Sequence, residues 1–204
     1  MDIDATAEGD VEIVPARRED ASHIAMLTDM AGHGLPAHFW ATAGERAAGT
    51  SLLEIGRERA RRDSGNFSWR NAWLARLDGD VAGVLLGYRQ PADLDAGDLS
   101  QLPELVRPLV ELEALAPGSW YLNVLAVYPE YRGRGVGRAL MDKALAVSAE
   151  QGAPSTSLIV EDVNVNARRL YAAMGFEERA LRPFVSFPFG PAAGNWILMV
   201  RDLR

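Results

Sequence analysis

Cysteine is absent from the 204 residues of this sequence, and histidine occurs only three times. Without cysteine there can be no disulfide bonds, no thiolate zinc sites and no cysteine nucleophile. The three histidines are scattered and show no pattern typical of metal ligands. We therefore expect no metal centre, and a reducing, cytoplasmic environment suits the chain.

A surplus of positive charge and long apolar runs are also missing. The formal net charge is −7 and the isoelectric point is near 5.0, whereas nucleic acids and anionic membranes select basic surfaces. The segment Met1–Asp10 is acidic and lacks a signal-peptide pattern, and no run approaches the roughly 18 apolar residues of a membrane span. We expect neither a nucleic-acid partner nor a membrane partner.

The length of the chain and its 48% hydrophobic content are sufficient for one sizeable core. We predict one domain over residues 11–204, preceded by a polar tail over residues 1–10. No internal repeat or low-complexity tract interrupts it.

A glycine-rich segment, Tyr131–Arg138, follows an apolar strand and precedes an apolar-periodic helix. Three of its residues are glycines, which allow a tight turn and a close approach to a ligand. The helix that follows presents its unpaired N–H groups at that point. Arg132, Arg134, Arg138 and Lys143 lie in or near this segment against a single acid, Asp142. The segment therefore predicts a site for a small polyanion.

Apolar periodicity and turn residues predict a mixed α/β fold with a strand–helix–strand unit at its centre. The helix after Asp20 ends at Gly32 and Gly34, and the residues from His33 to Trp40 are expected to form a loop. An insertion at about 90–119 carries one helix, kinked by proline. Strands are expected at Val11–Val14, Ala72–Leu77, Val81–Tyr88, Trp120–Tyr128, Ser157–Glu161, Phe176–Phe187 and Asn195–Arg201, and the other helices at Glu45–Arg62, Gly135–Gln151 and Asn164–Met174.

Two other phosphate-binding loops fit the glycine-rich segment poorly. A triphosphate-binding loop needs Lys and Ser or Thr after its last glycine, but Gly137 is followed by Arg138 and Ala139. A dinucleotide fingerprint needs a third glycine three residues after Gly135, where Arg138 stands. Glu161, at the end of the next strand, is nevertheless where a ribose-binding acid would lie.

The pattern Arg132-x-x-Gly135-x-Gly137 resembles the acyl-coenzyme A pyrophosphate loop of the GCN5-related N-acetyltransferases (GNAT family). The resemblance continues in Asn164-x-x-Ala167-x-x-Leu170-Tyr171-x-x-x-Gly175-Phe176, which is similar to that family's second cofactor motif. Family membership implies a central, mostly antiparallel sheet flanked by helices, and acetyl-CoA as cosubstrate. It also implies that the strand before the glycine turn splays from its neighbour.

By this resemblance, backbone groups of Leu125 and Val127 pair with the pantetheine arm. The cofactor-binding residues in and after the glycine turn are then Arg132, Gly133, Arg134, Gly135, Val136, Gly137, Arg138, Asn164 and Tyr171. The residues themselves leave simpler roles open, because Asn164 suits a helix N-cap and Tyr171 lies on the apolar face of its helix.

The implied chemistry is attack of an uncharged primary amine on the acetyl thioester, with Tyr171 as general acid. The reference pKa of tyrosine lies about 1.5 units above that of a thiol, so full proton transfer costs roughly 2 kcal/mol. The base is less defined, because Asn123 stands on the strand where family members often place a glutamate. Glu113 is the candidate base; Glu111, His33 and His38 are the alternatives.

The acceptor pocket is expected to be lined by His38, Phe39, Trp40 and the insertion around Leu102–Leu115. The acceptor itself is a small-molecule or peptide amine that the sequence does not identify. A coenzyme A-binding sensor without turnover is the main alternative, favoured by Asn123, and a nucleotide-binding role is a distant third. The family resemblance also suggests a homodimer.

Overall fold

The computed structural model describes residues 10–42, 49–188, 190 and 193–203, and within them seven strands form one sheet in the order β1-β2-β3-β4-β5-β7-β6. Only β4 and β5 pair in parallel; the other neighbours are antiparallel. The predicted mixed, mostly antiparallel sheet is therefore confirmed. The strands are β1 (Glu12–Pro15), β2 (Ala72–Leu77), β3 (Asp80–Arg89), β4 (Trp120–Val127), β5 (Ser155–Glu161), β6 (Glu177–Pro183) and β7 (Asn195–Asp202).

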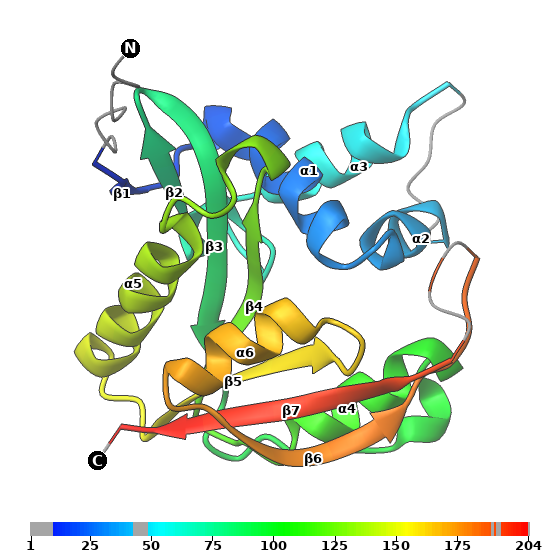
Figure 1. Ribbon diagram of the computed structural model, residues 1–204. Coiled ribbons are helices and arrows are strands. Elements are labelled where there is room, and N and C mark those ends of the chain that lie inside the picture. The colour runs from blue at the N-terminus through cyan, green and yellow to red at the C-terminus, as the bar shows by residue number, and fades with distance from the viewer. Residues whose placement is uncertain (1–9, 43–48, 189, 191–192, 204) are drawn as a thin grey trace.

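Six α-helices of the described chain cover the two faces of this sheet (Figure 1). They are α1 (Ala21–Ala31), α2 (Leu35–Thr42), α3 (Leu52–Ala60), α4 (Arg107–Glu113), α5 (Val136–Glu150) and α6 (Val165–Ala173). Buried side chains of α5 and α6 share one core on one face. On the opposite face, α1 and α3 pack against β2–β4, and α2 and α4 pack near β7. Figure 1 shows β2–β4 upright and β5–β7 running across them.

The hairpin between β2 and β3 follows from its turn residues. Leu77 pairs with Asp80, so Asp78 and Gly79 form a two-residue loop. Both have positive φ, 54° for Asp78 and 91° for Gly79, as the type I′ turn of a hairpin requires. The predicted hairpin is confirmed, with β3 beginning one residue earlier than expected.

The loop expected from His33 to Trp40 is wrong, because residues 35–42 form α2. Pro36 lies in the first turn of this helix, where a backbone N–H is not needed, so it starts the helix rather than breaking it. Gly34, with a φ of 87°, reverses the chain between α1 and α2. The Pro36 ring fits there because Gly32 lacks a side chain; a Cβ would lie 2.6 Å from the ring.

The helix expected over Glu45–Arg62 is shorter in the structure. Residues 45–48 lie outside the described part of the chain, as do residues 1–9 of the predicted tail. The described helix, α3, begins at Leu52, after Ser51, whose hydroxyl accepts a hydrogen bond from the Glu54 N–H at 3.1 Å. Such a cap satisfies one of the unpaired N–H groups at a helix start.

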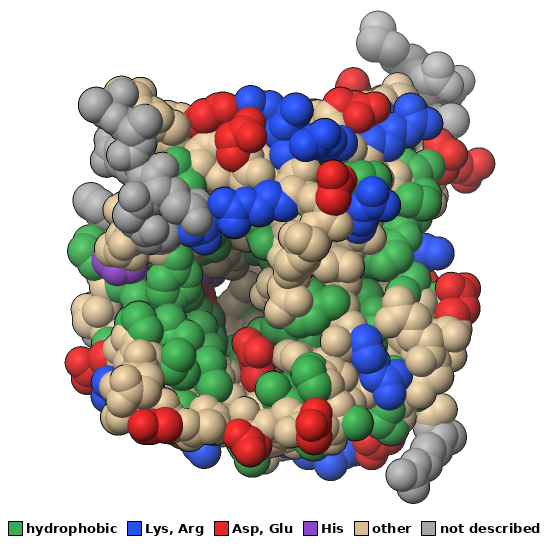
Figure 2. All heavy atoms as spheres, turned by 180° about the vertical axis from the view of Figure 1, so that it is seen from behind, with side chains coloured by type: hydrophobic (Ala, Val, Ile, Leu, Met, Phe, Trp, Pro, Cys, Tyr) green, Lys and Arg blue, Asp and Glu red, His purple; other side chains and the backbone are tan. Residues whose placement is uncertain are grey.

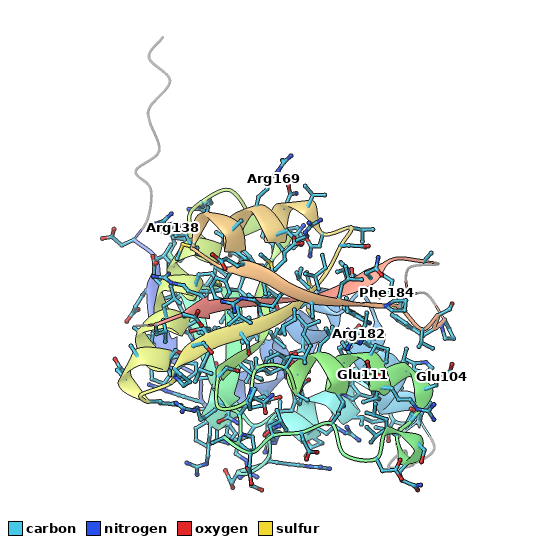
Figure 3. The ribbon with its side chains drawn as sticks, turned by 90° about the horizontal axis from the view of Figure 1, so that it is seen from below. Glu104, Glu111, Arg138, Arg169, Arg182 and Phe184 are labelled. Carbon is cyan, nitrogen blue, oxygen red and sulfur yellow. The ribbon has the colours of Figure 1, made fainter. Side chains whose placement is uncertain are left out.

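The insertion between β3 and β4 carries one α-helix, as expected, but this helix begins at Arg107 rather than near Leu102. Pro108 lies in its first turn, so the proline starts α4 instead of kinking it. Leu112 is fully buried against β7 residues. Arg182 of β6 forms an ion pair with Glu111 of α4, and Figure 3 shows the two side by side. The insertion thus covers the β5–β7 half of the sheet.

Candidate functional site

A cleft opens in the middle of the sheet, where β4 and β5 separate. Their pairing covers only Trp120–Leu122 against Thr156–Leu158, after which the two strands diverge. The cavity between them has a volume of about 660 Å³, within the ordinary range of small-molecule sites. Seen from behind, the molecule is hollowed near its centre (Figure 2). The splay that the family resemblance implies is therefore present.

The wall that β4 contributes is irregular at Asn123. Leu122 pairs with Gly87 and Val124 pairs with Leu86, so Asn123 has no partner on β3 and forms a β-bulge. Asn123 is exposed and lines the cleft. Bulges re-aim side chains and free backbone groups, and they are common beside active sites.

The glycine-rich segment forms one end of the cleft. Gly135, with a φ of 79°, is the N-cap of α5, and no acidic residue occupies the first turn of that helix. The first N–H groups of α5 therefore remain available to an anion. A Cβ at Gly133 or Gly135 would meet no atom within 4 Å, so both glycines border open space.

The arginines of this segment differ in position. Arg132 and Arg138 line the cleft, and Arg132 Nε donates a hydrogen bond of 3.3 Å to the carbonyl oxygen of Val127. Arg134 is outside the residues that line the cleft and pairs with Asp78 at 3.2 Å. The sequence placed all three at the cofactor, whereas the structure brings two of them to the cleft.

The wall opposite β4 is formed by β5 and α6. Asn164 caps α6 through a 3.3 Å hydrogen bond from the Ala167 N–H to Oδ1, and it also lines the cleft. Tyr171 lines the cleft and is only 6% exposed. Burial raises the pKa of Tyr171 to about 12. Full transfer of the Tyr171 proton to a thiolate with the reference thiol pKa then costs roughly 5 kcal/mol rather than 2. Tyr171 is therefore better suited to donate a hydrogen bond to the thiolate than to give up its proton.

His33 and Glu161 meet in the same cleft. His33 follows α1 and Glu161 ends β5, and the distance from Nδ1 to Oε2 is 2.6 Å. The Glu161 side chain is 4% exposed and that of His33 is 48% exposed. The second carboxylate oxygen, Oε1, is buried and has no hydrogen-bond partner.

The candidate base Glu113 is not among the residues that line the cleft. Its Oε2 accepts a 3.1 Å hydrogen bond from Gln90 Nε2, and it also bonds to Tyr121. Glu111, one of the alternatives, is paired with Arg182. These contacts attach the insertion to the sheet and give neither carboxylate a place in the cleft.

The acceptor pocket expected at His38, Phe39 and Trp40 is not where the cleft lies, because none of the three lines it. Trp40 is 4% exposed and packs against Ala25 and Ile55, so it belongs to the core. The His38 ring contacts Phe39 and Phe187. Trp40 points inward because the segment is helical, so its side chain is not placed to line a pocket.

The buried carboxyl group of Glu113 should make the stability of the protein depend on pH. Burial raises the pKa of Glu113, although hydrogen bonds from Gln90 and Tyr121 lower it. The folded protein therefore holds this proton more tightly than the unfolded chain, and the resulting stabilisation is lost as the pH rises above the usual glutamate range. We expect the stability of Glu113→Gln, measured by urea unfolding, to increase relative to that of the wild type as the pH rises above about 5. Glu104→Gln, at an exposed position of the same insertion, is the control; a pH-independent difference for Glu113→Gln would contradict the assignment.

Sequence reasoning missed Glu161 as part of this site. It assigned Glu161 only to the dinucleotide alternative, and it left His33 among several candidates. One signal was present: Glu161 ends an apolar strand at its carboxyl end, where open α/β sheets bind ligands. No pattern in the sequence indicated that Glu161 contacts His33.

Metal and membrane features can be assessed only over residues 10–42, 49–188, 190 and 193–203. There, no group of three or more His, Asp or Glu side chains is placed to hold a metal ion. No helix in the same ranges has the length and apolarity needed to cross a membrane.

Comparison with known proteins identifies related sequences. The acetyltransferase (GNAT) family model matches residues 45–176. An uncharacterized N-acetyltransferase of Mycobacterium bovis is 39% identical over 82 residues, which are 40% of this chain and 51% of that protein. A mycothiol acetyltransferase of Beutenbergia cavernae is 43% identical over 67 residues, 33% of this chain and 23% of that protein. The chain thus spans about half, or less, of the curated relatives it matches.

Solved structures share the fold at low sequence identity. A crystal structure of an acetyltransferase superposes with a TM-score of 0.64 at 21% identity, covering 95% of this chain and all of the other. The protein yncA from Salmonella typhimurium, solved with acetyl-CoA, gives a TM-score of 0.58 at 18% identity, covering 96% of this chain and 95% of that one. These matches establish the fold on nearly the full length of the chain.

Proposed function

Because the chain belongs to the GNAT family of acetyltransferases, we propose that it moves an acetyl group from acetyl-CoA to a primary amine. The observation that supports this most is the cleft between β4 and β5, with the start of α5 at its end. Such a cleft can hold both substrates together, so that the amine attacks the thioester directly. Holding the reactants in position supplies much of the rate.

The acetyl-CoA pyrophosphate is assigned to the glycine-rich segment. Gly133 and Gly135 let the backbone approach the anion, and Val136 and Gly137 begin the helix whose N–H groups donate to it. Arg132 and Arg138 add positive charge in the cleft. The free backbone of β4 at Leu125 and Val127 suits the amides of the pantetheine arm, and Asn164 borders the same space.

Two protons must move in this reaction. An alkyl amine is protonated near neutral pH, so a base has to remove one proton before attack. A backbone N–H of β4 near the bulge at Asn123 is suited to donate to the thioester oxygen as negative charge develops. Tyr171, which lines the cleft, is assigned as the hydrogen-bond donor to the leaving thiolate.

A coenzyme A-binding sensor without turnover is the second candidate. Asn123 supports it, because an amide in the wall of the cleft cannot serve as a base at neutral pH. Under this alternative the cleft still binds coenzyme A, but no amine accelerates release of the thiol.

Release of free thiol from acetyl-CoA separates the two candidates. The panel of acceptors includes cadaverine, spermidine, kanamycin and a peptide with a free N-terminus, each compared with an amine-free control. Amine-dependent thiol release with an acetylated product supports the transferase. Tight coenzyme A binding without amine-dependent release would favour the sensor, and tighter binding of NAD than of coenzyme A would contradict both.

A further inference from the structure

The cleft contains a histidine–carboxylate pair whose atoms have the arrangement of a base and its orienting group. His33 Nδ1 lies 2.6 Å from Glu161 Oε2, although the residues are 128 positions apart in the sequence. Both residues line the cleft that also contains Tyr171 and Leu125. The pair therefore belongs to the cavity in which the amine and the thioester would meet.

The hydrogen bond determines which nitrogen is basic. An ionised carboxylate only accepts hydrogen bonds, so the proton of a neutral His33 is on Nδ1 and the lone pair is on Nε2. Among the described residues, Nε2 makes no hydrogen bond. Glu161 Oε1 is buried and also lacks a partner, and a buried carboxylate oxygen calls for a donor. A protonated primary amine supplies such donors.

The pair and Tyr171 lie on opposite faces of the sheet. Glu161 is directly opposite Trp196 of β7, which packs in the core beneath α4. Tyr171 packs in the other core, with Leu158 and Val160. Because residues paired across antiparallel strands share a face, Glu161 points away from the side of Tyr171. The amine and the leaving thiol would thus find their proton-transfer groups on opposite sides of the splayed strands.

The backbone holds His33 in an uncommon conformation. Its φ is 48°, in the left-handed region that residues other than glycine rarely adopt. The turn is held by hydrogen bonds from the Gly34 N–H to the Asp29 carbonyl and from the Gly32 N–H to the Thr28 carbonyl, both 3.1 Å long. Asp29 Oδ1 accepts the Ala37 N–H at 2.9 Å, which ties α1 to α2. Uncommon backbone conformations of this kind are found at functional sites.

We propose that His33 is the general base of the transfer reaction and that Glu161 is its positioning residue and receives the acceptor ammonium. This inference rests on the proposed function. An N–H bond of the ammonium breaks and its proton passes to His33 Nε2. The freed lone pair forms the C–N bond, the C–S bond breaks, and the thiolate leaves while it accepts a hydrogen bond from the Tyr171 hydroxyl. The nitrogen then loses its second proton, which reaches the thiolate through solvent and gives the free thiol, and His33 releases the first proton to solvent.

The charged and titratable surroundings of His33 come from several elements. Glu161 of β5 is its direct partner, and Asp29 of α1 is engaged by the Ala37 N–H. On α2, the His38 ring contacts the rings of Phe39 and Phe187. The other charged or titratable groups that line the cleft are Tyr131, Arg132, Arg138 and Tyr171. Glu161 is therefore the acid that faces His33 within the described part of the cleft.

His33→Asn is the main test. Asparagine tolerates a positive φ and keeps a donor toward Glu161, but it has no basic nitrogen. With the best amine of the panel, we expect kcat at pH 7 to fall about 10²-fold, with coenzyme A affinity unchanged. His23→Asn is the matched control, because His23 contacts Tyr128 at 3.0 Å and is not among the residues that line the cleft.

The pH profile separates a base from a merely structural residue. Without its base, His33→Asn depends on the small fraction of amine that is already uncharged. Its loss of kcat relative to the wild type should therefore be largest near pH 7 and become smaller toward pH 9. Glu161→Gln should raise KM for the amine and lower kcat about tenfold, and this loss of kcat should also become smaller toward pH 9. His33→Gly suits the backbone conformation, and added imidazole should restore part of its turnover.

A His33→Asn variant with kcat within about twofold of the wild type and an unchanged pH profile would overturn the assignment of the base. A His33→Gly variant that is fully active without imidazole would do the same. These outcomes leave the proposed function intact, because the wild type still transfers acetyl groups. A wild-type protein that acetylates no amine of the panel overturns the proposed function and this inference with it.

Discussion

Replacing Gly135 with valine is expected to abolish measurable coenzyme A binding while the protein remains folded. Gly135 caps α5 with a φ of 79°, and a side chain there would extend into open space rather than into the core. That space is where we propose the pyrophosphate approaches the helix N–H groups. Loss of two hydrogen bonds to a charged group, each about 1.5–3 kcal/mol, corresponds to a loss of affinity of at least about 10²-fold.

Gly152→Val is the matched control for Gly135→Val. Gly152 follows α5 at its other end, has a φ of 63°, and a Cβ there also meets no atom within 4 Å. Both variants carry a comparable backbone strain of about 1–2 kcal/mol, which thermal unfolding would report. Only Gly135→Val should lose affinity in calorimetric titration with coenzyme A. Equal affinity of the two variants would mean that the glycine segment is only a turn.

Replacing Tyr171 with phenylalanine is expected to lower turnover about 10²-fold, because the leaving thiolate loses the hydrogen bond that stabilises its developing negative charge. The variant keeps the ring, which packs 6.1 Å from the ring of Phe176, so the core is retained. Coenzyme A affinity should change little, because only the hydroxyl is removed. The measurement is kcat for thiol release with the best amine of the panel, together with calorimetric titration of coenzyme A.

Tyr128→Phe is the control for Tyr171→Phe, because Tyr128 is not among the residues that line the cleft. The raised pKa of Tyr171, about 12, keeps its hydroxyl protonated throughout the usual assay range. The wild-type profile should therefore show no alkaline loss of activity from this group below about pH 11. Full turnover in Tyr171→Phe would show that the residue serves only the core.

The two substitutions also separate enzyme from sensor. Gly135→Val tests binding, which both candidates need, whereas Tyr171→Phe tests turnover, which only a transferase has. If Gly135→Val abolishes coenzyme A binding, but neither the wild type nor Tyr171→Phe shows turnover, the protein is the sensor.

Several features could be predicted from local sequence because neighbouring residues determine them. Asp78 and Gly79 predict their hairpin turn through the backbone conformations they favour. Asn164 was expected to cap a helix and does so through the Ala167 N–H. The glycine segment lies between a strand and a helix, as expected, because its glycines permit the positive φ values there.

Other features depended on context that a short window lacks. Pro36 was expected in a loop and Pro108 in the middle of a kinked helix, yet both lie in a first turn, where proline is compatible with the helix. Trp40 was expected in a pocket and is instead buried against Ala25 and Ile55. Its orientation depends on where α2 begins and on which helix packs against it.

The sequence by itself determined the family, the glycine turn at the start of α5 and the capped start of α6, because each depends on residues a few positions apart. Only the tertiary structure decided which charged groups share the cleft. His33 and Glu161 come together because β4 and β5 separate after three paired residues and the end of α1 reaches the opening. Arg134 and Glu113 lie outside the cleft, where Arg134 pairs with Asp78 and Glu113 accepts a hydrogen bond from Gln90. Contacts between residues so distant in the chain follow from packing of the whole sheet, which no local pattern encodes.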